Sequence, residues 1–189
     1  MLNKNLTIFF LIFFHSVLNS ACLEEHKHLL IFSKEKFYSA DFSQSFENKE
    51  KETIFGKIIL KKPFFLKISN TNLNSIESEI IINEKSIYRI DYDLDQAVKY
   101  KKENIIHQIP AAFLLEDLES ICLNSAKIDC FDNSCAIFPK DKTYISKIDL
   151  IFDDTFITNI KYRDAFGITS EVVITNFTSQ PKLSSSVFS

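Results

Sequence analysis

Three aspartates have the residue type that calcium chemistry needs, although their surroundings do not fit it. Three aspartates stand at positions 1, 3 and 5 of a possible calcium-binding loop, namely Asp91, Asp93 and Asp95. The sixth position of such a loop is normally Gly and the twelfth is normally Glu. Here they are Gln96 and Lys102. The sequence therefore predicts no calcium site at this segment.

Two histidines and a group of acidic residues also fail as candidates for metal binding or acid–base catalysis. His26 and His28 are two positions apart, so on a helix their side chains do not face each other. Glu116, Asp117 and Glu119 lie off the apolar stripe of a short amphipathic helix, which is typical of an exposed face. We expect neither group to hold a metal or to carry out catalysis.

The chain also lacks the short motifs that mark common enzyme sites. It contains no GxSxG, no HExxH and no glycine-rich phosphate loop. Gly56 and Gly167 are its two glycines, so a backbone cradle for phosphate is hard to build. The sequence therefore predicts a protein that is not an enzyme and that needs neither a cofactor nor a metal.

The four cysteines have two possible uses. Cys130 and Cys135 flank the turn-forming residues Asp132, Asn133 and Ser134, which favours a hairpin joined by a disulfide. A zinc knuckle is the alternative, but two further ligands do not stand at a familiar spacing. The other two cysteines, at positions 22 and 122, either remain free or pair with each other, and spacing does not decide between these states.

The N-terminus indicates export. Lys4 precedes a mostly apolar run, Leu6–Leu18, and small or polar residues follow up to Ala21. This pattern is typical of a secretory signal peptide over residues 1–21, followed by a single mature domain over 22–189. Cys22 directly follows Ala21, so a lipoprotein acylated at Cys22 remains an alternative, although the preceding tripeptide matches that signal only in part. The net charge of −3 argues against nucleic-acid binding.

Alternating apolar and polar residues dominate the rest of the chain, which is the pattern of half-buried strands. The alternation is clearest in FYSADFSQSF, residues 37–46. Further strands are expected at 53–62, 64–68, 78–83, 86–93, 96–102, 126–130, 135–139, 144–152, 155–163 and 169–177. Helices are expected at 23–36 and, led by Pro110, at 110–122. The predicted fold is mainly β (α+β): an incomplete antiparallel β-barrel, or strongly curved sheet, of about ten or eleven strands with helices covering its concave face.

One lysine interrupts an apolar stripe. The even-numbered positions from Gly56 to Ile68 are otherwise apolar, yet Lys62 falls among them. A lone cation on an apolar face is costly unless it is paired or reaches solvent. Either Lys62 has a specific partner, or Pro63 marks a bulge that turns it outward.

Several motifs resemble those of the periplasmic outer-membrane lipoprotein carriers, the LolA family. FYSADFSQSF is similar to the family's Phe-x-Ala-x-Phe-x-Gln pattern, and GKIILKKP is similar to its Gly-x-x-x-x-Lys-Arg-Pro pattern, with Lys62 in the place of Arg. Later segments of the family are resembled, in the same order, by INEKSIYRIDYDLDQ, PAAFLL and DAFGITSEVVITNF. The resemblance covers nearly all of the mature chain.

The resemblance implies a half-barrel with a helical lid over a face that holds acyl chains. On this view the lipid-binding residues are Phe42, Phe46, Ile58, Leu60, Phe64, Leu66, Ile68, Tyr88 and Ile90. The lid would carry Pro110, Phe113, Leu114 and Leu118, and Lys62 would latch it by bonding to lid carbonyls.

The resemblance also implies a function. The protein would take lipoproteins from an inner-membrane ABC transporter and deliver them through the periplasm to an outer-membrane receptor. We expect it to act as a monomer. One alternative is a membrane-anchored receptor of the same fold, acylated at Cys22. A hydrolase acting on envelope lipids is a second alternative from another class.

Overall fold

The structure, a computed structural model, describes residues 22, 29, 34, 36–47, 52–72, 75–153 and 156–179. The predicted signal peptide at 1–21 lies outside these residues, as does most of the helix predicted for 23–36. None of the helices in these described ranges is long and apolar enough to cross a membrane.

Eleven antiparallel strands form one sheet, and their positions follow the sequence prediction closely. The strands are β1 Phe37–Phe46, β2 Thr53–Lys61, β3 Phe65–Asn72, β4 Ser75–Ile82, β5 Ser86–Asp91, β6 Gln96–Lys101, β7 Ser125–Phe131, β8 Ser134–Pro139, β9 Ile145–Asp153, β10 Phe156–Asp164 and β11 Thr169–Ser179. Their order across the sheet is β6-β5-β4-β3-β2-β1-β11-β10-β9-β8-β7. Two meanders are therefore joined by the pairing of β1 with β11, which brings the two ends of the domain together.

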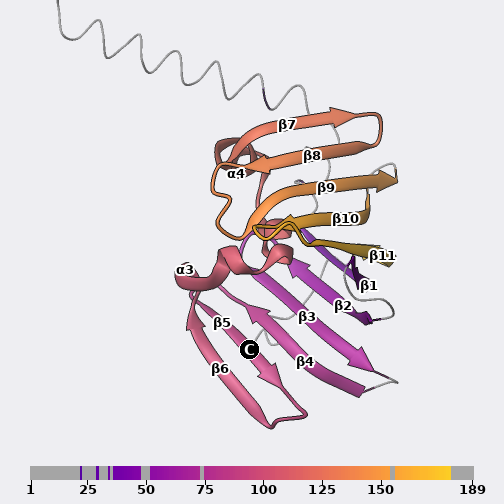
Figure 1. Ribbon diagram of the computed structural model, residues 1–189. Helices are drawn as coiled ribbons and strands as arrows, with labels where there is room; N and C mark the ends of the chain where they lie inside the picture. Colours follow the sequence, from indigo (N-terminus) through magenta and orange to yellow (C-terminus); the bar gives the residue numbers. More distant parts are fainter. Residues whose placement is uncertain are drawn as a thin grey trace, which may run out of the picture.

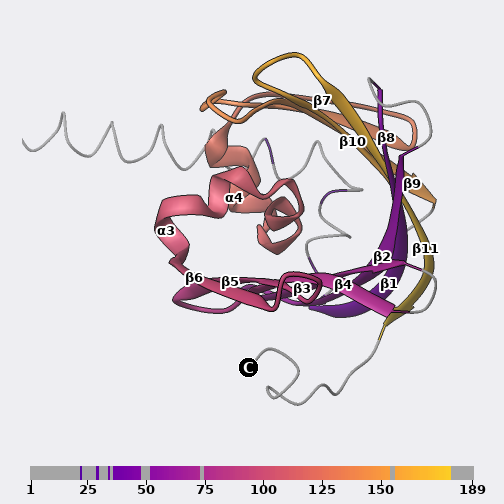
Figure 2. The ribbon, with the colours of Figure 1, turned by 60° about the horizontal axis from the view of Figure 1, so that its bottom comes forward.

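The sheet curls strongly but does not close. Figure 1 shows its strands in order, and Figure 2 shows the sheet bent around a set of helices, with β6 and β7 on either side of the opening. An antiparallel sheet of this many twisted strands curls because each strand is rotated relative to its neighbour. The predicted incomplete barrel is confirmed.

Among the described residues from 36 to 179, the helices come from one connection, between β6 and β7. They are α3 Lys102–Ile105, the 3-10 helices η1 Ile106–Gln108 and η2 Pro110–Leu115, and α4 Leu118–Asn124. The prediction of one continuous helix over 110–122 is wrong, because Glu116 and Asp117 are extended between η2 and α4. The Asp117 carboxylate accepts a hydrogen bond from the Ser120 N–H at 2.8 Å, which caps α4 and starts it as a new helix. We call residues 110–124 the lid segment.

A row of buried side chains crosses the concave face of the sheet. The row has one residue from each of five neighbouring strands, each opposite the next and at most 2% exposed: Tyr38, Leu60, Leu66, Ile82 and Ile87. They belong to the main hydrophobic core together with the apolar side chains of the lid segment. The lid segment thus covers the concave face, and η2 contacts β2 and β3 directly.

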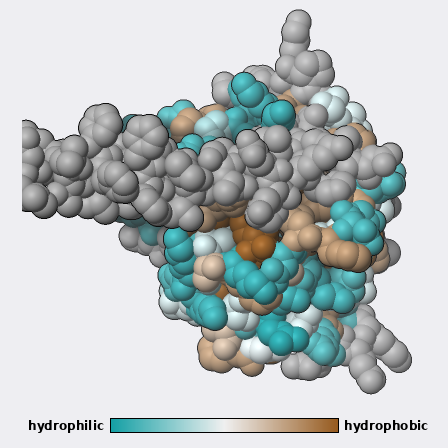
Figure 3. All heavy atoms as spheres, turned by 90° about the horizontal axis from the view of Figure 1, so that it is seen from above, coloured by the Kyte–Doolittle hydropathy of each residue, from teal (hydrophilic) through white to brown (hydrophobic). Residues whose placement is uncertain are grey.

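The coloured part of one face of the molecule carries both hydrophilic and hydrophobic side chains. Figure 3 shows one face of the molecule, seen from above the orientation of Figure 1, with a small hydrophobic patch next to the grey atoms and hydrophilic side chains below the patch. A patch of this kind is common on folded proteins and by itself indicates nothing specific.

Candidate functional site

Most of the predicted lipid-binding residues lie on the concave face beneath the lid segment. Those on β1 to β3 are Phe42, Phe46, Ile58, Leu60, Leu66 and Ile68. Phe46 is half-buried and the other five are buried in the main core. They share this core with Leu114 and Leu118 of the lid segment, and η2 contacts β2 and β3, so a movement of the lid segment would uncover part of this face. Their binding role stays a prediction.

Three of the predicted lipid-binding residues lie elsewhere. Tyr88 stands opposite Ile81 and Ile90 stands opposite Glu79, so both are on the convex face. The inward residue of β5 is Ile87, which is fully buried. Alternation in SIYRID is ambiguous because both parities carry apolar side chains, and the sequence pattern selected the wrong one. Phe64 lies in the turn between β2 and β3 and is 44% exposed.

A pocket of about 470 Å³ lies between the helical connection and strands β8 and β9. Its size is within the range of ordinary ligand sites. Its apolar walls are Pro63, Ile106, Ile109, Pro110, Ala112, Phe113, Leu115, Ile137, Pro139, Tyr144, Ile145 and Ile148. Charged residues also line it, namely Lys102, Glu116, Asp117, Lys140 and Asp141. An apolar cavity with a few charged groups suits an amphiphilic molecule, which has an apolar part and a polar part.

The lid residues predicted from the sequence divide between two faces of the lid segment. Leu114 and Leu118 are at most 2% exposed and pack into the core. Pro110 and Phe113 line the pocket instead. The lid segment therefore contributes both to the buried core and to the wall of the pocket, and a movement of it would alter both.

Lys62 makes the kind of contact that the sequence suggested. Its ammonium donates a hydrogen bond to the backbone carbonyl oxygen of Glu116, at 3.3 Å. Glu116 lies between η2 and α4, so the bond ties the β2–β3 turn to the middle of the lid segment. The Ser120 N–H and side chain lower the pKa of Asp117, and the nearby charge of Lys62 lowers it further. Whether this tie controls opening stays a prediction.

Sequence reasoning missed the contribution of the second half of the sheet. Ile137, Ile145 and Ile148 line the pocket from β8 and β9, and Tyr144 lines it from the loop before β9. Alternation in CAIFP and in the β9 segment predicts that Ile137 and Ile148 face inward. Ile145 has the opposite parity to Ile148, so alternation does not place it at the pocket. Nor does alternation predict that the β6–β7 connection would cross to this half of the sheet.

Two disulfides join the four cysteines. Cys130 and Cys135 stand opposite each other on β7 and β8 and are bonded, as expected for a hairpin. Cys22 is bonded to Cys122, which lies in α4. The second disulfide ties a residue near the N-terminus to the lid segment, across a sequence separation of 100 residues.

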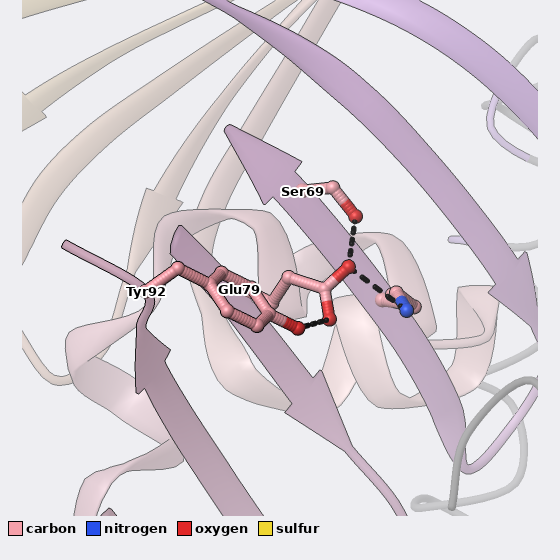
Figure 4. Close-up of polar contacts among 4 residues, drawn as sticks. Ser69, Glu79 and Tyr92 are labelled. Atoms are coloured by element: carbon pink, nitrogen blue, oxygen red, sulfur yellow. Dashed lines mark hydrogen bonds and ion pairs between the residues drawn. The ribbon is translucent and has the colours of Figure 1, made fainter. Parts of the chain in front are cut away.

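A buried carboxylate on the convex face has a structural explanation. Glu79 accepts hydrogen bonds from Ser69 Oγ at 2.7 Å and from the Tyr92 hydroxyl at 2.9 Å, and it forms an ion pair with Lys67 at 2.8 Å (Figure 4). Burial alone would raise the pKa of Glu79. The bonds from Lys67, Ser69 and Tyr92, with the charge of Lys67, outweigh burial and hold the pKa below its ordinary value. These contacts tie β3 and β4 to the β5–β6 turn.

Known structures share this fold at low sequence identity. A LolA superfamily protein from Nitrosomonas europaea is 10% identical with a TM-score of 0.52, and the match covers 86% of this chain and 96% of that one. A domain from Vibrio parahaemolyticus named for outer membrane lipoprotein sorting is 12% identical with a TM-score of 0.54, covering 89% of this chain and 94% of that one. A DUF1329 family protein from Desulfovibrio piger is 9% identical with a TM-score of 0.55, covering 90% and 96%.

Sequence comparison matches this chain to a family model but to no individual curated protein. No curated protein sequence matches this chain. The family model described as outer membrane lipoprotein carrier protein LolA matches residues 33–189. This match spans all eleven strands, the lid segment and the pocket. The chain therefore belongs to the LolA family of outer membrane lipoprotein carrier proteins.

Proposed function

We propose that this protein is a carrier that binds the acyl chains of lipoproteins and moves them through the periplasm. The observation that carries the proposal is the apolar pocket between the lid segment and β8–β9, in a chain that belongs to a family of lipoprotein carriers. On this proposal the protein receives its cargo from an inner-membrane ABC transporter and hands it to an outer-membrane receptor.

Acyl-chain transfer through water needs a carrier of this kind. Burying a methylene group contributes about 0.8 kcal/mol, so each long chain contributes on the order of 10 kcal/mol and does not leave a membrane unaided. A carrier needs an apolar cavity that fills and empties, and it needs no bond-making chemistry. We therefore propose a binding protein rather than an enzyme.

The lid segment is a suitable gate for such a cavity. It packs on the concave face through apolar side chains. Two side-chain bonds to its carbonyls, Lys62 to Glu116 at 3.3 Å and Lys140 to Leu123 at 2.6 Å, also hold it. Displacing it would expose Leu60 and Leu66 to an incoming chain and would enlarge the space next to the pocket.

A membrane-anchored receptor is the less favoured alternative. That function requires an acyl group on the sulfur of Cys22. Here the sulfur is bonded to Cys122 instead, and a sulfur in a disulfide cannot carry the acyl group. Intact mass of the exported protein tests this, because an acyl adduct on Cys22 would establish the anchored receptor.

Native mass spectrometry of protein purified from the periplasm tests carriage directly. We expect bound lipoprotein, and we expect Ile145→Trp, which narrows the pocket, to reduce the bound fraction. Ile151→Trp is the matched control, because Ile151 is an exposed residue of the same strand and does not line the pocket. Equal loss of cargo in both variants, or no cargo in the wild type, would contradict the proposal.

A further inference from the structure

The charged group with the least compensation at the pocket is Lys102. This residue begins α3, directly after the edge strand β6, and lines the pocket. Its backbone N–H donates to the Lys85 carbonyl oxygen at 3.1 Å, which fixes its backbone position. Its ammonium lies 5.7 Å from the centre of the Phe64 ring. Among the residues that the structure describes, no carboxylate lies within ion-pair distance of it.

Three other charged residues of the pocket differ from Lys102 in having close oxygen or N–H partners. Lys140 donates to the Leu123 carbonyl oxygen at 2.6 Å. Asp117 accepts from the Ser120 N–H at 2.8 Å, and Asp141 accepts from the Thr143 N–H at 2.9 Å. Lys102 therefore stands out as a half-buried cation whose close neighbour is an aromatic ring.

Burial of an ammonium without an anion is unfavourable. Burial lowers the pKa of Lys102, and the carboxylate of Glu84 opposes this change only in part. The face of an aromatic ring attracts a cation weakly compared with a carboxylate or a phosphate. An anionic group entering the pocket mouth would remove this deficit.

We infer that the pocket takes single-chain amphiphiles with an anionic head, and that Lys102 binds the head while the apolar walls hold the chain. The inference rests on the proposed acyl-chain site and adds a ligand class to it. The shared chemistry is an anionic oxygen group at the end of one acyl chain. A fatty-acid carboxylate and a lipid phosphate both supply such a group.

Binding measured below micellar concentrations with matched probes tests the inference. Myristate is compared with tetradecanol, and lysophosphatidylglycerol is compared with a monoacylglycerol of the same chain length. We expect the wild type to bind at least one anionic probe about tenfold more tightly than its neutral partner, as a charged hydrogen bond of ordinary strength implies. A preference for myristate over tetradecanol identifies the head group as a carboxylate. A preference for lysophosphatidylglycerol over the monoacylglycerol identifies it as a phosphate.

Variants test whether Lys102 causes the preference for anionic over neutral probes. Lys102→Met should keep the affinity for neutral probes and abolish the preference, and Lys102→Arg should retain it. Lys99→Met is the matched control, because Lys99 also lies over a ring, that of Tyr88 at 5.3 Å, but does not line the pocket. Lys99→Met should prefer anionic over neutral probes to the same extent as the wild type.

The outcomes separate this inference from the proposed function. Equal binding of anionic and neutral probes by the wild type overturns the anionic-head inference and leaves acyl-chain binding intact. A preference that survives in Lys102→Met also overturns it. Failure of all four probes to bind overturns both proposals.

Discussion

At the scale of single residues, Lys62 illustrates how one side chain joins the sheet to the lid segment. It comes from an otherwise apolar stripe and donates to the Glu116 carbonyl oxygen. At 3.3 Å this bond is at the long end for an N–H donor to oxygen. Lysine also lacks the planar fork of arginine, so this bond should be weaker than the one an arginine could make at the same position.

We predict that Lys62→Leu folds and accepts lipid but releases it poorly. A hydrogen bond to a charged group contributes about 1.5–3 kcal/mol, so its loss shifts the balance between open and closed states by about tenfold or more. The closed, empty state would then compete less well with the loaded state. The measurement is the rate of cargo transfer to acceptor membranes. Lys62→Arg should transfer at least as well as the wild type, and equal rates for Lys62→Leu and the wild type would rule out a latch.

Gly56 is required by close approach rather than by backbone angle. A Cβ at this position would lie 2.6 Å from the Phe42 ring and would also overlap the Ser69 carbonyl oxygen. We predict that Gly56→Ala costs at least about 1–3 kcal/mol of unfolding free energy, as overpacking does, measured by urea denaturation.

Gly167→Ala is the comparison for that variant. Gly167 has φ of +85° with open space around it, so the cost there comes from backbone strain of about 1–2 kcal/mol. Combining Gly56→Ala with Phe42→Leu should recover only part of the loss, because the overlap with the Ser69 backbone remains. Full recovery would show that the ring alone requires the glycine.

The Glu79 cluster predicts a pH dependence of stability. Its pKa is held below the ordinary value of 4.5 in the folded chain. A carboxylate with a depressed folded pKa contributes stability that is fully present above its unfolded pKa and is lost as pH falls through the folded value. We therefore expect Glu79→Gln to lower the unfolding free energy by about 1–3 kcal/mol at neutral pH, with the difference from wild type shrinking below pH 4.5.

Urea denaturation at several pH values measures that difference. Glu119→Gln is the control, because Glu119 is an exposed residue of α4. A constant difference between Glu79→Gln and the wild type across the acidic range would show that the charge of Glu79 does not stabilise the fold.

At the scale of elements, the two disulfides should contribute differently because they close loops of different length. The chain-entropy model assigns about 4.7 kcal/mol to a loop of roughly 100 residues and about 2 kcal/mol to a very short one. Cys22–Cys122 has a separation of 100 residues and Cys130–Cys135 a separation of 5. We predict that the pair Cys22→Ser and Cys122→Ser destabilises the protein more than the pair Cys130→Ser and Cys135→Ser.

The same two double variants test control of the lid segment. Removing the Cys22–Cys122 bond should also speed hydrogen exchange in α4, which contains Cys122, whereas removing the hairpin disulfide should affect only β7 and β8. Exchange in α4 that is the same in both double variants would show that the long-range disulfide does not restrain the lid segment.

At the scale of the whole molecule, stability should be highest at the middle of the sheet. β1, β2, β10 and β11 are paired on both sides, whereas β6 and β7 are the edges of the eleven-stranded order. The lid segment is joined to the sheet chiefly by side-chain packing and a few hydrogen bonds. A carrier must open at its least stable part.

We predict that amide exchange is slowest in β1, β2, β10 and β11 and fastest in residues 102–124. Addition of a neutral acyl probe, tetradecanol, should slow exchange in residues 102–124 and raise the melting temperature, because a ligand bound only to the folded state stabilises it. Exchange in the lid segment as slow as that in β1 would contradict an opening lid.

Local sequence patterns predicted the strands, and short motifs predicted the family. Alternation in residues 37–46 predicted β1 at its observed bounds, and ten further runs each became a strand. The spacing of Cys130 and Cys135 predicted their pairing. Lys62 stood out as a cation that either has a specific partner or is turned outward at Pro63, and it bonds to the Glu116 carbonyl oxygen. These features are local, because the two-residue period of a strand and the geometry of a short hairpin depend on neighbouring residues alone.

Which surfaces meet could not be predicted from the sequence and became clear from the folded structure. Both parities of SIYRID are partly apolar, and the pairing of Ile82 with Ile87 placed Tyr88 and Ile90 on the convex face. The capping of α4 by Asp117 divided one expected helix in two, and the path of the β6–β7 connection built a pocket from β8 and β9. The pairing of Cys22 with Cys122 likewise joins residues far apart in the chain. Each of these depends on contacts between distant segments, which a local pattern does not encode.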